Sequence, residues 1–421
     1  MNILIKQAKV VSSTSGYNGR IVDILIENGK ITEIKKTIPA KGNVKLIECE
    51  GLCVSTGWVD MQAASGDPGF EHKETLDTLI ECAASGGFTA VCVHSCNEPA
   101  LHTKSQIEYI INKTKNKAVS VLPFGTITVD ARGKDMAEMY DMKIAGAAGF
   151  SDYKHSIKDA GMVLRALQYA SNIDALIITH CNDESISHGG QMNEGEVAVT
   201  LGLKGSPALA EELMIQRNLS ILEYTGGKLH IPTISTKGSI ELIKTAKTNG
   251  LNVTAGVAAA NLSLNDSALK DFDTNYKTEP PLRTKKDAQA LCNALASGII
   301  DVVVSDHYPQ DIESKELEFD LAEPGIINLQ TAFACALEGM KERNIEMLIR
   351  SLTDNPRMIL GMEMPEIEEQ HEANLTLFSL IGETTFNESF NKSRSKNSPF
   401  TNKVLRGRVI GIINGHKSFF N

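Results

Sequence analysis

Residues 75–94 read TLDTLIECAASGGFTAVCVH, and this stretch is the clearest indication of the fold. Its first half, Thr75–Ser85, has the apolar spacing of a helix. Its second half, Phe88–His94, is a short apolar run typical of a strand buried on both faces. Gly86 and Gly87 separate the two elements. A helix that leads directly into a buried strand is the repeating unit of folds with a parallel sheet.

The same alternation continues over about 250 residues, the usual length of one α/β barrel. The predicted strands are Gly57–Gln62, Phe88–His94, Ala118–Phe124, Ala147–Ser151, Ala175–His180, Lys228–Thr233, Leu251–Val257 and Ile300–Ser305. The predicted helices are Thr75–Ser85, Lys104–Thr114, Gly161–Ser171, Pro207–Asn218, Ser239–Asn249 and Lys285–Ser297. This pattern favours a (β/α)₈ TIM-type barrel. A doubly wound open sheet also alternates, but it usually has fewer strands, and the sequence has no GxGxxG at the first turn.

Both ends of the chain have a different pattern, in which short segments of alternating apolar and polar residues are separated by tight turns. Strands are predicted at Ile3–Val11, Ile21–Glu27, Lys30–Ile34 and Lys45–Glu48, and Asn28-Gly29 is a strong hairpin signal. Strands return at Asn374–Leu380, Val404–Ile413 and the last residues, around a polar stretch, Gly382–Asn402, predicted to be a loop. We expect the two ends to pair into one small sheet domain beside the barrel.

Composition and charge narrow the classes of function. The 421 residues carry a net charge of −10, which argues against a nucleic-acid-binding surface. No apolar run reaches the ~18 residues of a membrane helix, and the first residues lack the apolar core of a signal peptide. The eight cysteines form no CxxC pair and mostly adjoin apolar runs, which indicates reduced thiols and a cytoplasmic protein.

In a barrel the chemistry lies at the carboxyl ends of the strands. Polar residues stand at these ends: Asp60, Gln62, His94, Asp152, His180, Thr233, Asp306 and His307. They indicate a site, or simply helix caps and water-binding groups. The sequence contains no HxH, HExxH, Walker A or GxSxG motif, and no pair with the spacing of zinc ligands. Cys181, beside His180, is interpreted as buried packing rather than as a nucleophile.

Several segments resemble class I dihydroorotases of the amidohydrolase superfamily. They are Gly57–Glu74 (GWVDMQAASGDPGFEHKE), Ala148–Asp152 (AGFSD), Thr179–Asp183 (THCND), Asn193–Gly205 (NEGEVAVTLGLKG), Thr225–Gly238 (TGGKLHIPTISTKG), Asp273–Arg283 (DTNYKTEPPLR), Ser305–Gln310 (SDHYPQ) and Ser395–Phe400 (SKNSPF). The similarity is collinear along essentially the whole chain. It implies a distorted (β/α)₈ barrel at residues 56–364, flanked by a small β-sandwich domain built from residues 1–55 and 365–421.

The resemblance also implies where a metal site should be. The family uses an HxH after strand 1, a bridging Asp in FSDDG, one His each after strands 5 and 6, and an Asp after strand 8. In family members these residues hold one or two divalent metals, generally zinc, which supply hydroxide. In this chain the first three positions fall on Gln62, Ala64 and Tyr153, and the strand-6 position falls on Thr233. His180 and Asp306 remain as the surviving ligand positions, and Asp306 also occupies the family's general-base position.

Family positions that bind substrate have changed as well. They fall on Gly66, Cys96, Glu279 and Gln310, where the family has Arg, Asn, Asn and His. Glycine cannot replace the Arg that pairs with a substrate carboxylate, and Glu279 would repel an anion. Zinc normally keeps three protein ligands, so two survivors are too few for a tight site. We therefore expect a catalytically degenerate homologue with no cofactor, whose own substrate-binding residues the sequence does not define.

Three functions stay open. The first is a non-catalytic partner of aspartate transcarbamoylase in de novo pyrimidine (UMP) biosynthesis, as a homodimer or part of a larger assembly. The second is an active cyclic amidohydrolase with one zinc on His180, Asp306 and Asp60. The third is a small-molecule-binding module using Asp60, Asp152, His180 and Glu279.

Four local expectations accompany these functions. His180 and Asp306 should hydrogen-bond to each other or to Asp60. The Tyr153 side chain should fill space that a metal would take. His230 should face the helices, because it lies an odd number of residues before Thr233. His307 is a second-choice ligand.

Overall fold

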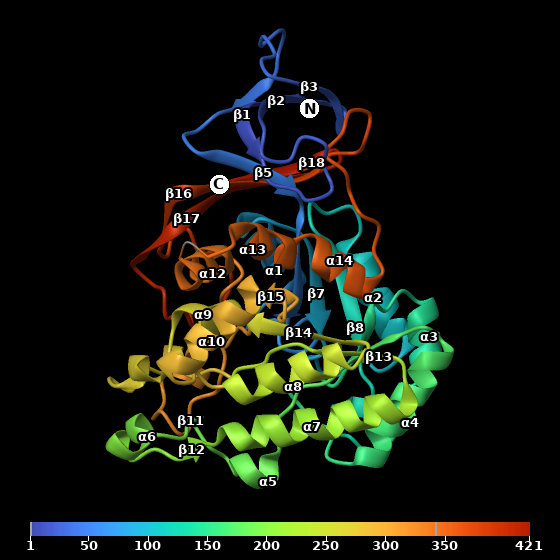
Figure 1. Cartoon of the computed structure of the whole chain (residues 1–421), viewed down its shortest axis with the longest axis vertical. Helices are drawn as coiled ribbons and strands as arrows, with labels where there is room; N and C mark the ends of the chain where they lie inside the picture. The colour runs from blue at the N-terminus through green and yellow to red at the C-terminus, as the bar shows by residue number, and fades with distance from the viewer. Residues whose placement is uncertain (1, 342) are drawn as a thin grey trace.

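The computed structural model describes residues 2–341 and 343–421, and its strands form two large sheets (Figure 1). The strands are β1 (Ile3–Val10), β2 (Ile21–Glu27), β3 (Lys30–Lys35), β4 (Lys45–Ile47), β5 (Leu52–Thr56), β6 (Trp58–Ala64), β7 (Phe88–His94), β8 (Ser120–Gly125), β9 (Gly149–Ser151), β10 (Leu176–Ile178), β11 (Met192–Asn193), β12 (Gly205–Ser206), β13 (Lys228–Ile231), β14 (Val253–Ala258), β15 (Val302–Val304), β16 (Asn374–Phe386), β17 (Lys403–Asn414) and β18 (Lys417–Phe420).

Helices alternate with the central strands. They are α1 (Leu76–Ser85), α2 (Lys104–Thr114), α3 (Met139–Ile144), α4 (Ala160–Asn172), α5 (Glu184–Ser187), α6 (Glu196–Leu201), α7 (Ala208–Thr225), α8 (Lys237–Thr248), α9 (Ala259–Ser263), α10 (Lys285–Ala296), α11 (Ile312–Lys315), α12 (Ala332–Met340), α13 (Ile345–Leu352) and α14 (Asp354–Leu360). Each of the six predicted helices has a counterpart here. Among the described residues, no helix combines the length and apolar character that a membrane crossing requires.

The predicted barrel is confirmed. Its eight strands follow the order β15-β14-β13-β10-β9-β8-β7-β6, and neighbouring strands are parallel. A bridge between Ala63 and His307 brings β6 beside the end of β15, with the Ala64 amide donating to the His307 carbonyl at 2.9 Å. The barrel interior holds apolar side chains such as Met61, Phe124 and Val304.

The two ends of the chain share the second sheet, which lies at one end of the barrel in Figure 1 and carries both termini. β5 pairs antiparallel with β16 and parallel with β1, so residues more than 300 positions apart form one surface. The fold class, a barrel with a flanking β domain from both termini, is confirmed. The exact domain boundaries, at residues 55/56 and 364/365, stay a prediction.

One predicted boundary was wrong. The loop expected at Gly382–Asn402 begins later, because β16 continues to Phe386, which pairs with Lys403 of β17. The shorter loop reaches the carboxyl end of the barrel, where Asn397 donates to the carbonyls of Tyr308 at 3.1 Å and Gly325 at 3.0 Å. Polar Ser, Asn and Lys side chains suggested a solvated loop, but many of them bond to the barrel mouth instead.

Candidate functional site

The end of β6 and the segment after β15 meet at the mouth, as the strand order requires. Asp60 accepts hydrogen bonds from the amide and the hydroxyl of Ser305, each at 2.7 Å. Burial raises the pKa of Asp60 to about 7, although the two Ser305 hydrogen bonds oppose that shift. Both carboxylate oxygens of Asp60 are therefore used in hydrogen bonds that join β6 to the segment after β15.

The neighbouring Asp306 belongs to an ion pair with Lys154, a residue that sequence reasoning did not single out. The Lys154 ammonium lies 2.8 Å from Oδ1 and 3.0 Å from Oδ2 of Asp306, and the two side chains are only 7% and 9% exposed. Lys154 also donates to the backbone carbonyl of Glu279. Gln62 completes the set by donating to Asp306 Oδ1 at 3.2 Å. A side-chain cation thus neutralises the surviving carboxylate.

Local backbone geometry brings Lys154 to this position. Tyr153 and Asp306 both have left-handed backbone conformations, with φ of 53° and 49°. Such values are uncommon for residues other than glycine and turn the chain sharply. The signal in the sequence was a lysine where the family motif FSDDG has its glycine, immediately after Tyr153.

Asp152 and Tyr153 also have defined partners. Asp152 accepts from the amides of Ile127 and Thr128 at 2.8 and 3.0 Å and from the Thr128 hydroxyl at 2.5 Å. The Tyr153 ring packs against His94 at 5.0 Å and Tyr308 at 5.4 Å between centroids. Asp152 is thus used to hold a loop, and the buried Tyr153 ring occupies space at the mouth, as predicted.

The bond expected between His180 and Asp306, or from either to Asp60, is absent from the described residues. His180 lies across the mouth, where its Nε2 is 3.6 Å from Glu279 Oε1, too long for a hydrogen bond. Burial raises the pKa of Glu279, but His180, Lys154 and His155 outweigh it, so the net shift is downward. The prediction failed because Lys154 supplies Asp306 with a stronger, charged partner.

The former ligand positions leave several buried polar atoms unsatisfied. Gln62 Oε1, Tyr153 Oη, Thr233 Oγ1 and both ring nitrogens of His180 have no hydrogen-bond partner among the described residues. Ala64 offers no polar side-chain atom. Buried polar atoms in proteins are normally paired, often by water or a ligand.

These residues do not fit a zinc site of the family type. Across the described chain, neither His180 nor Asp306 belongs to any trio of His, Cys, Asp or Glu ligands that could reach one ion. A catalytic zinc normally has three protein ligands. Here Asp306 faces an ammonium, Asp60 is used by Ser305, and Tyr153 and Thr233 offer poor ligands. Metal binding at this mouth would require breaking the Lys154–Asp306 pair.

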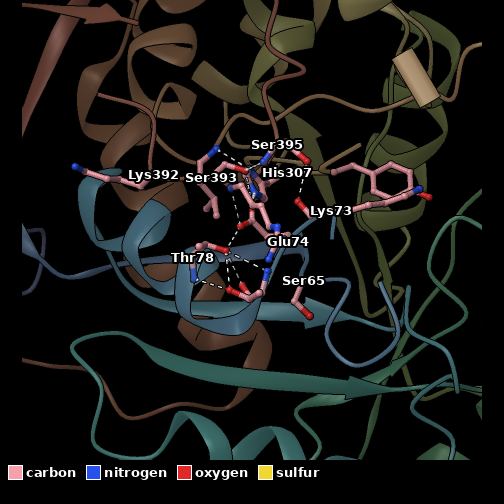
Figure 2. Close-up of polar contacts among 12 residues, drawn as sticks. Ser65, Lys73, Glu74, Thr78, His307, Lys392, Ser393 and Ser395 are labelled. Atoms are coloured by element: carbon pink, nitrogen blue, oxygen red, sulfur yellow. Dashed lines mark hydrogen bonds and ion pairs between the residues drawn. The ribbon is translucent and has the colours of Figure 1, made fainter. Parts of the chain in front are cut away.

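A second buried cluster, Glu74, Cys82 and His307, has suitable ligand atoms close together, and Glu74 and His307 in it also have hydrogen-bond partners. Figure 2 shows Glu74 between Thr78, Ser393 and His307, and His307 Nε2 lies 3.3 Å from Glu74 Oε2. His307 Nδ1 accepts from the Asn328 amide at 3.1 Å, so Nε2 carries the proton and donates to Glu74. The cluster fastens the β16–β17 loop to the mouth, and the role of His307 as a second-choice ligand stays a prediction.

His230 is the other expectation that the structure corrects. It pairs in register with Ile178, whose side chain lies in the barrel interior, so His230 points inward and not toward the helices. The prediction counted alternate residues to Thr233, but β13 ends at Ile231 and the count does not continue past it. Burial lowers the pKa of His230 to about 3 and that of the inward-facing His94 to about 3 as well.

The barrel and its flanking β domain define a class of fold, the one shared by the hydantoinases. L-Hydantoinase (dihydropyrimidinase) from Arthrobacter aurescens superposes with a TM-score of 0.85 at 22% identity, over 99% of this chain and 95% of that one. Dihydropyrimidinase from Brevibacillus agri gives a TM-score of 0.82 at 20% identity, over 100% of this chain and 95% of that one. These likenesses establish the fold.

Sequence comparison specifies the family. The family model for dihydro-orotase-like proteins matches residues 51–239. Dihydroorotase of Acetivibrio thermocellus is 38% identical over 98% of both chains, and dihydroorotase of Syntrophus aciditrophicus is 36% identical over 97% of both. The chain belongs to the dihydroorotase family, which confirms the resemblance seen in the sequence.

Proposed function

We propose that this chain is a non-catalytic dihydroorotase homologue of de novo pyrimidine biosynthesis that associates with aspartate transcarbamoylase. The observation that carries the proposal is the buried Lys154–Asp306 pair, which places a cation of the protein itself on the surviving ligand and general-base position. Without a metal, the pKa of water at the mouth is not lowered, and water supplies little hydroxide. The scaffold around this mouth is nevertheless complete, which fits a role in assembly.

The proposed partner is testable by co-purification. The full chain, tagged, is mixed with aspartate transcarbamoylase of the same organism at micromolar concentrations, with a tagged hydantoinase as control bait. We expect a stable complex by size exclusion and a change in the stability or rate of the transcarbamoylase. No complex and no effect would remove this role. We also propose a homodimer or larger assembly, measured by light scattering, and a cytoplasmic location, which the eight free thiols support.

The second candidate is an active, metal-dependent cyclic amidohydrolase with an atypical site. Full-length identity of 38% to a protein named dihydroorotase and the retained Asp306 favour it. It predicts hydrolysis of dihydroorotate in the presence of zinc, cobalt or manganese, and loss of that turnover in Asp306→Ala.

Metal content separates the two candidates. After incubation with excess zinc and desalting, we expect the wild-type chain to keep well below one equivalent, because two surviving ligands are too few. Elemental analysis measures this, with an active dihydroorotase as the positive control. Near-stoichiometric zinc together with turnover that Asp306→Ala abolishes would establish the second candidate.

A further inference from the structure

A cavity of about 550 Å³ opens at the mouth on the side of β10 and of the segment before Pro280. His180 and Glu279 line it, together with Arg283, Lys277, Asp320 and Glu323. Asp60, Asp152 and Asp306 do not line this cavity, and each is used by another contact. The part of the mouth left for a ligand is therefore the His180–Glu279 side.

Two features of this cavity point to a ligand. The His180 side chain is 3% exposed, lines the cavity, and has no hydrogen-bond partner at either ring nitrogen among the described residues. Glu279, 3.6 Å away, is 32% exposed and carries a negative charge without a hydrogen-bonded cation on its carboxylate. A buried imidazole normally has a partner, so a group that reaches both side chains would complete the site.

The charged residues that line the cavity determine which charge a ligand can carry. Both cations in the lining already have hydrogen-bond acceptors, but only the charge of Arg283 is offset by a paired carboxylate. Arg283 donates to the Ser206 carbonyl at 2.6 Å and lies 3.8 Å from Glu211, while Lys277 donates to the carbonyl of Phe319 at 2.8 Å. The remaining carboxylates of the lining, Glu184, Glu279, Asp320 and Glu323, make the cavity acidic, although Glu184 pairs with Lys158 outside it. An anion such as dihydroorotate would be repelled, and a cation would be attracted.

We propose that this cavity binds a small organic cation with at least two N–H donors, an amine or a guanidine. One N–H group donates to the Glu279 carboxylate and another to a ring nitrogen of His180. The backbone carbonyl of Glu279 accepts a hydrogen bond from Lys154, which holds this part of the backbone at the mouth. The inference rests on that part of the proposed function which keeps metal out of the mouth, and it is independent of the transcarbamoylase.

Agmatine, which carries both a primary amine and a guanidine, is a suitable probe. The full chain, treated with a chelator, is titrated with agmatine by calorimetry, and in parallel with potassium chloride at matched ionic strength and with dihydroorotate. We expect saturable binding of agmatine at or below about 1 mM, and none of the other two. Glu279→Gln should weaken agmatine at least about tenfold, because a charged hydrogen bond is lost.

Controls make each outcome decisive. Glu388→Gln changes an exposed carboxylate that does not line the cavity, and it should bind agmatine like the wild type. If Glu279→Gln does not fold by circular dichroism, His180→Asn replaces it. No saturable binding, equal binding by the cavity variant, or binding of potassium or dihydroorotate instead would overturn the inference. None of those results bears on co-purification with the transcarbamoylase, whereas zinc-dependent turnover would remove the proposed function.

Discussion

Each side of the barrel mouth carries one residue at a family ligand position, Asp306 on one side and His180 on the other, but the surroundings of the two residues differ. On the Lys154–Asp306 side a buried lysine neutralises the surviving aspartate, and Gln62 adds a third contact. On the His180–Glu279 side His180 lines a cavity, and neither of its ring nitrogens has a hydrogen-bond partner among the described residues. The first side is closed by its own charges, whereas the second still lacks a group that would complete it. The two sides therefore differ in whether a group from outside the chain is needed to satisfy the buried side chains.

The largest loss of stability is expected on the Lys154–Asp306 side, which is closed by its own ion pair. Lys154→Met leaves Asp306 as a buried carboxylate without its cation, and breaking such a pair typically costs about 3–5 kcal/mol. Urea denaturation of the full chain measures the loss. The double variant Lys154→Met/Asp306→Leu should recover most of it, because an apolar pair replaces the ionic one.

Lys396→Met tests the same change in an exposed pair with Glu388, where about 0–1 kcal/mol is expected. If Lys154→Met costs no more than this control, the closed side is not held by its ion pair and the comparison between the two sides fails.

The interior histidines beneath the mouth predict how stability depends on pH. Burial lowers the pKa of His94 to about 3, whereas an unfolded histidine titrates near 6.5. The free energy of unfolding is therefore independent of His94 protonation above pH 6.5. It decreases as pH falls toward 3, because His94 takes up a proton in the unfolded state before it does so in the folded state. The expected slope is about 1.4 kcal/mol per pH unit for one site.

His94→Phe should reduce this slope between pH 6.5 and 5 by about one proton, measured by urea unfolding at several pH values. Phenylalanine keeps an aromatic ring against Phe124 and Tyr153, the two rings that His94 contacts. Exposed His416→Gln serves as the control and should leave the slope unchanged. An unchanged slope in His94→Phe would mean that His94 is protonated in the folded protein.

Much of the scaffold was predictable from the sequence, because buried parallel strands such as Phe88–His94 carry their signal in consecutive residues. The side-chain contacts of the site could not be predicted in the same way. Lys154 and Asp306 lie 152 positions apart, and their pairing depends on left-handed backbone at Tyr153 and Asp306. That Gln62 and Tyr153 stand at family ligand positions was visible only through the family resemblance, and the cation beside Asp306 was not visible at all.

A smaller effect is expected from the loop that supports Lys154. Thr128→Val removes the hydroxyl that donates to Asp152 and accepts from the Gly133 amide at 2.8 Å, which should cost about 1–2 kcal/mol. Burial raises the pKa of Asp152 and the Thr128 hydroxyl lowers it, so the pKa of Asp152 should also rise in this variant. The exposed Thr248→Val is the matched control. Equal unfolding midpoints for both variants would mean that Asp152 does not brace this side of the mouth.

The smallest effect is expected from Tyr153→Phe, which removes a hydroxyl at the mouth and keeps the ring. The Tyr153 hydroxyl has no partner among the described residues, so Tyr153→Phe should change the free energy of unfolding by less than about 1 kcal/mol, with stabilisation the expected direction. Tyr153→Ala also removes the ring between His94 and Tyr308, and a change of this kind costs about 3–5 kcal/mol. Chemical denaturation compares the two. A cost above about 1 kcal/mol for Tyr153→Phe would mean that the hydroxyl bonds to an ordered water or ligand, and that the incomplete side of the mouth extends from His180 to Tyr153.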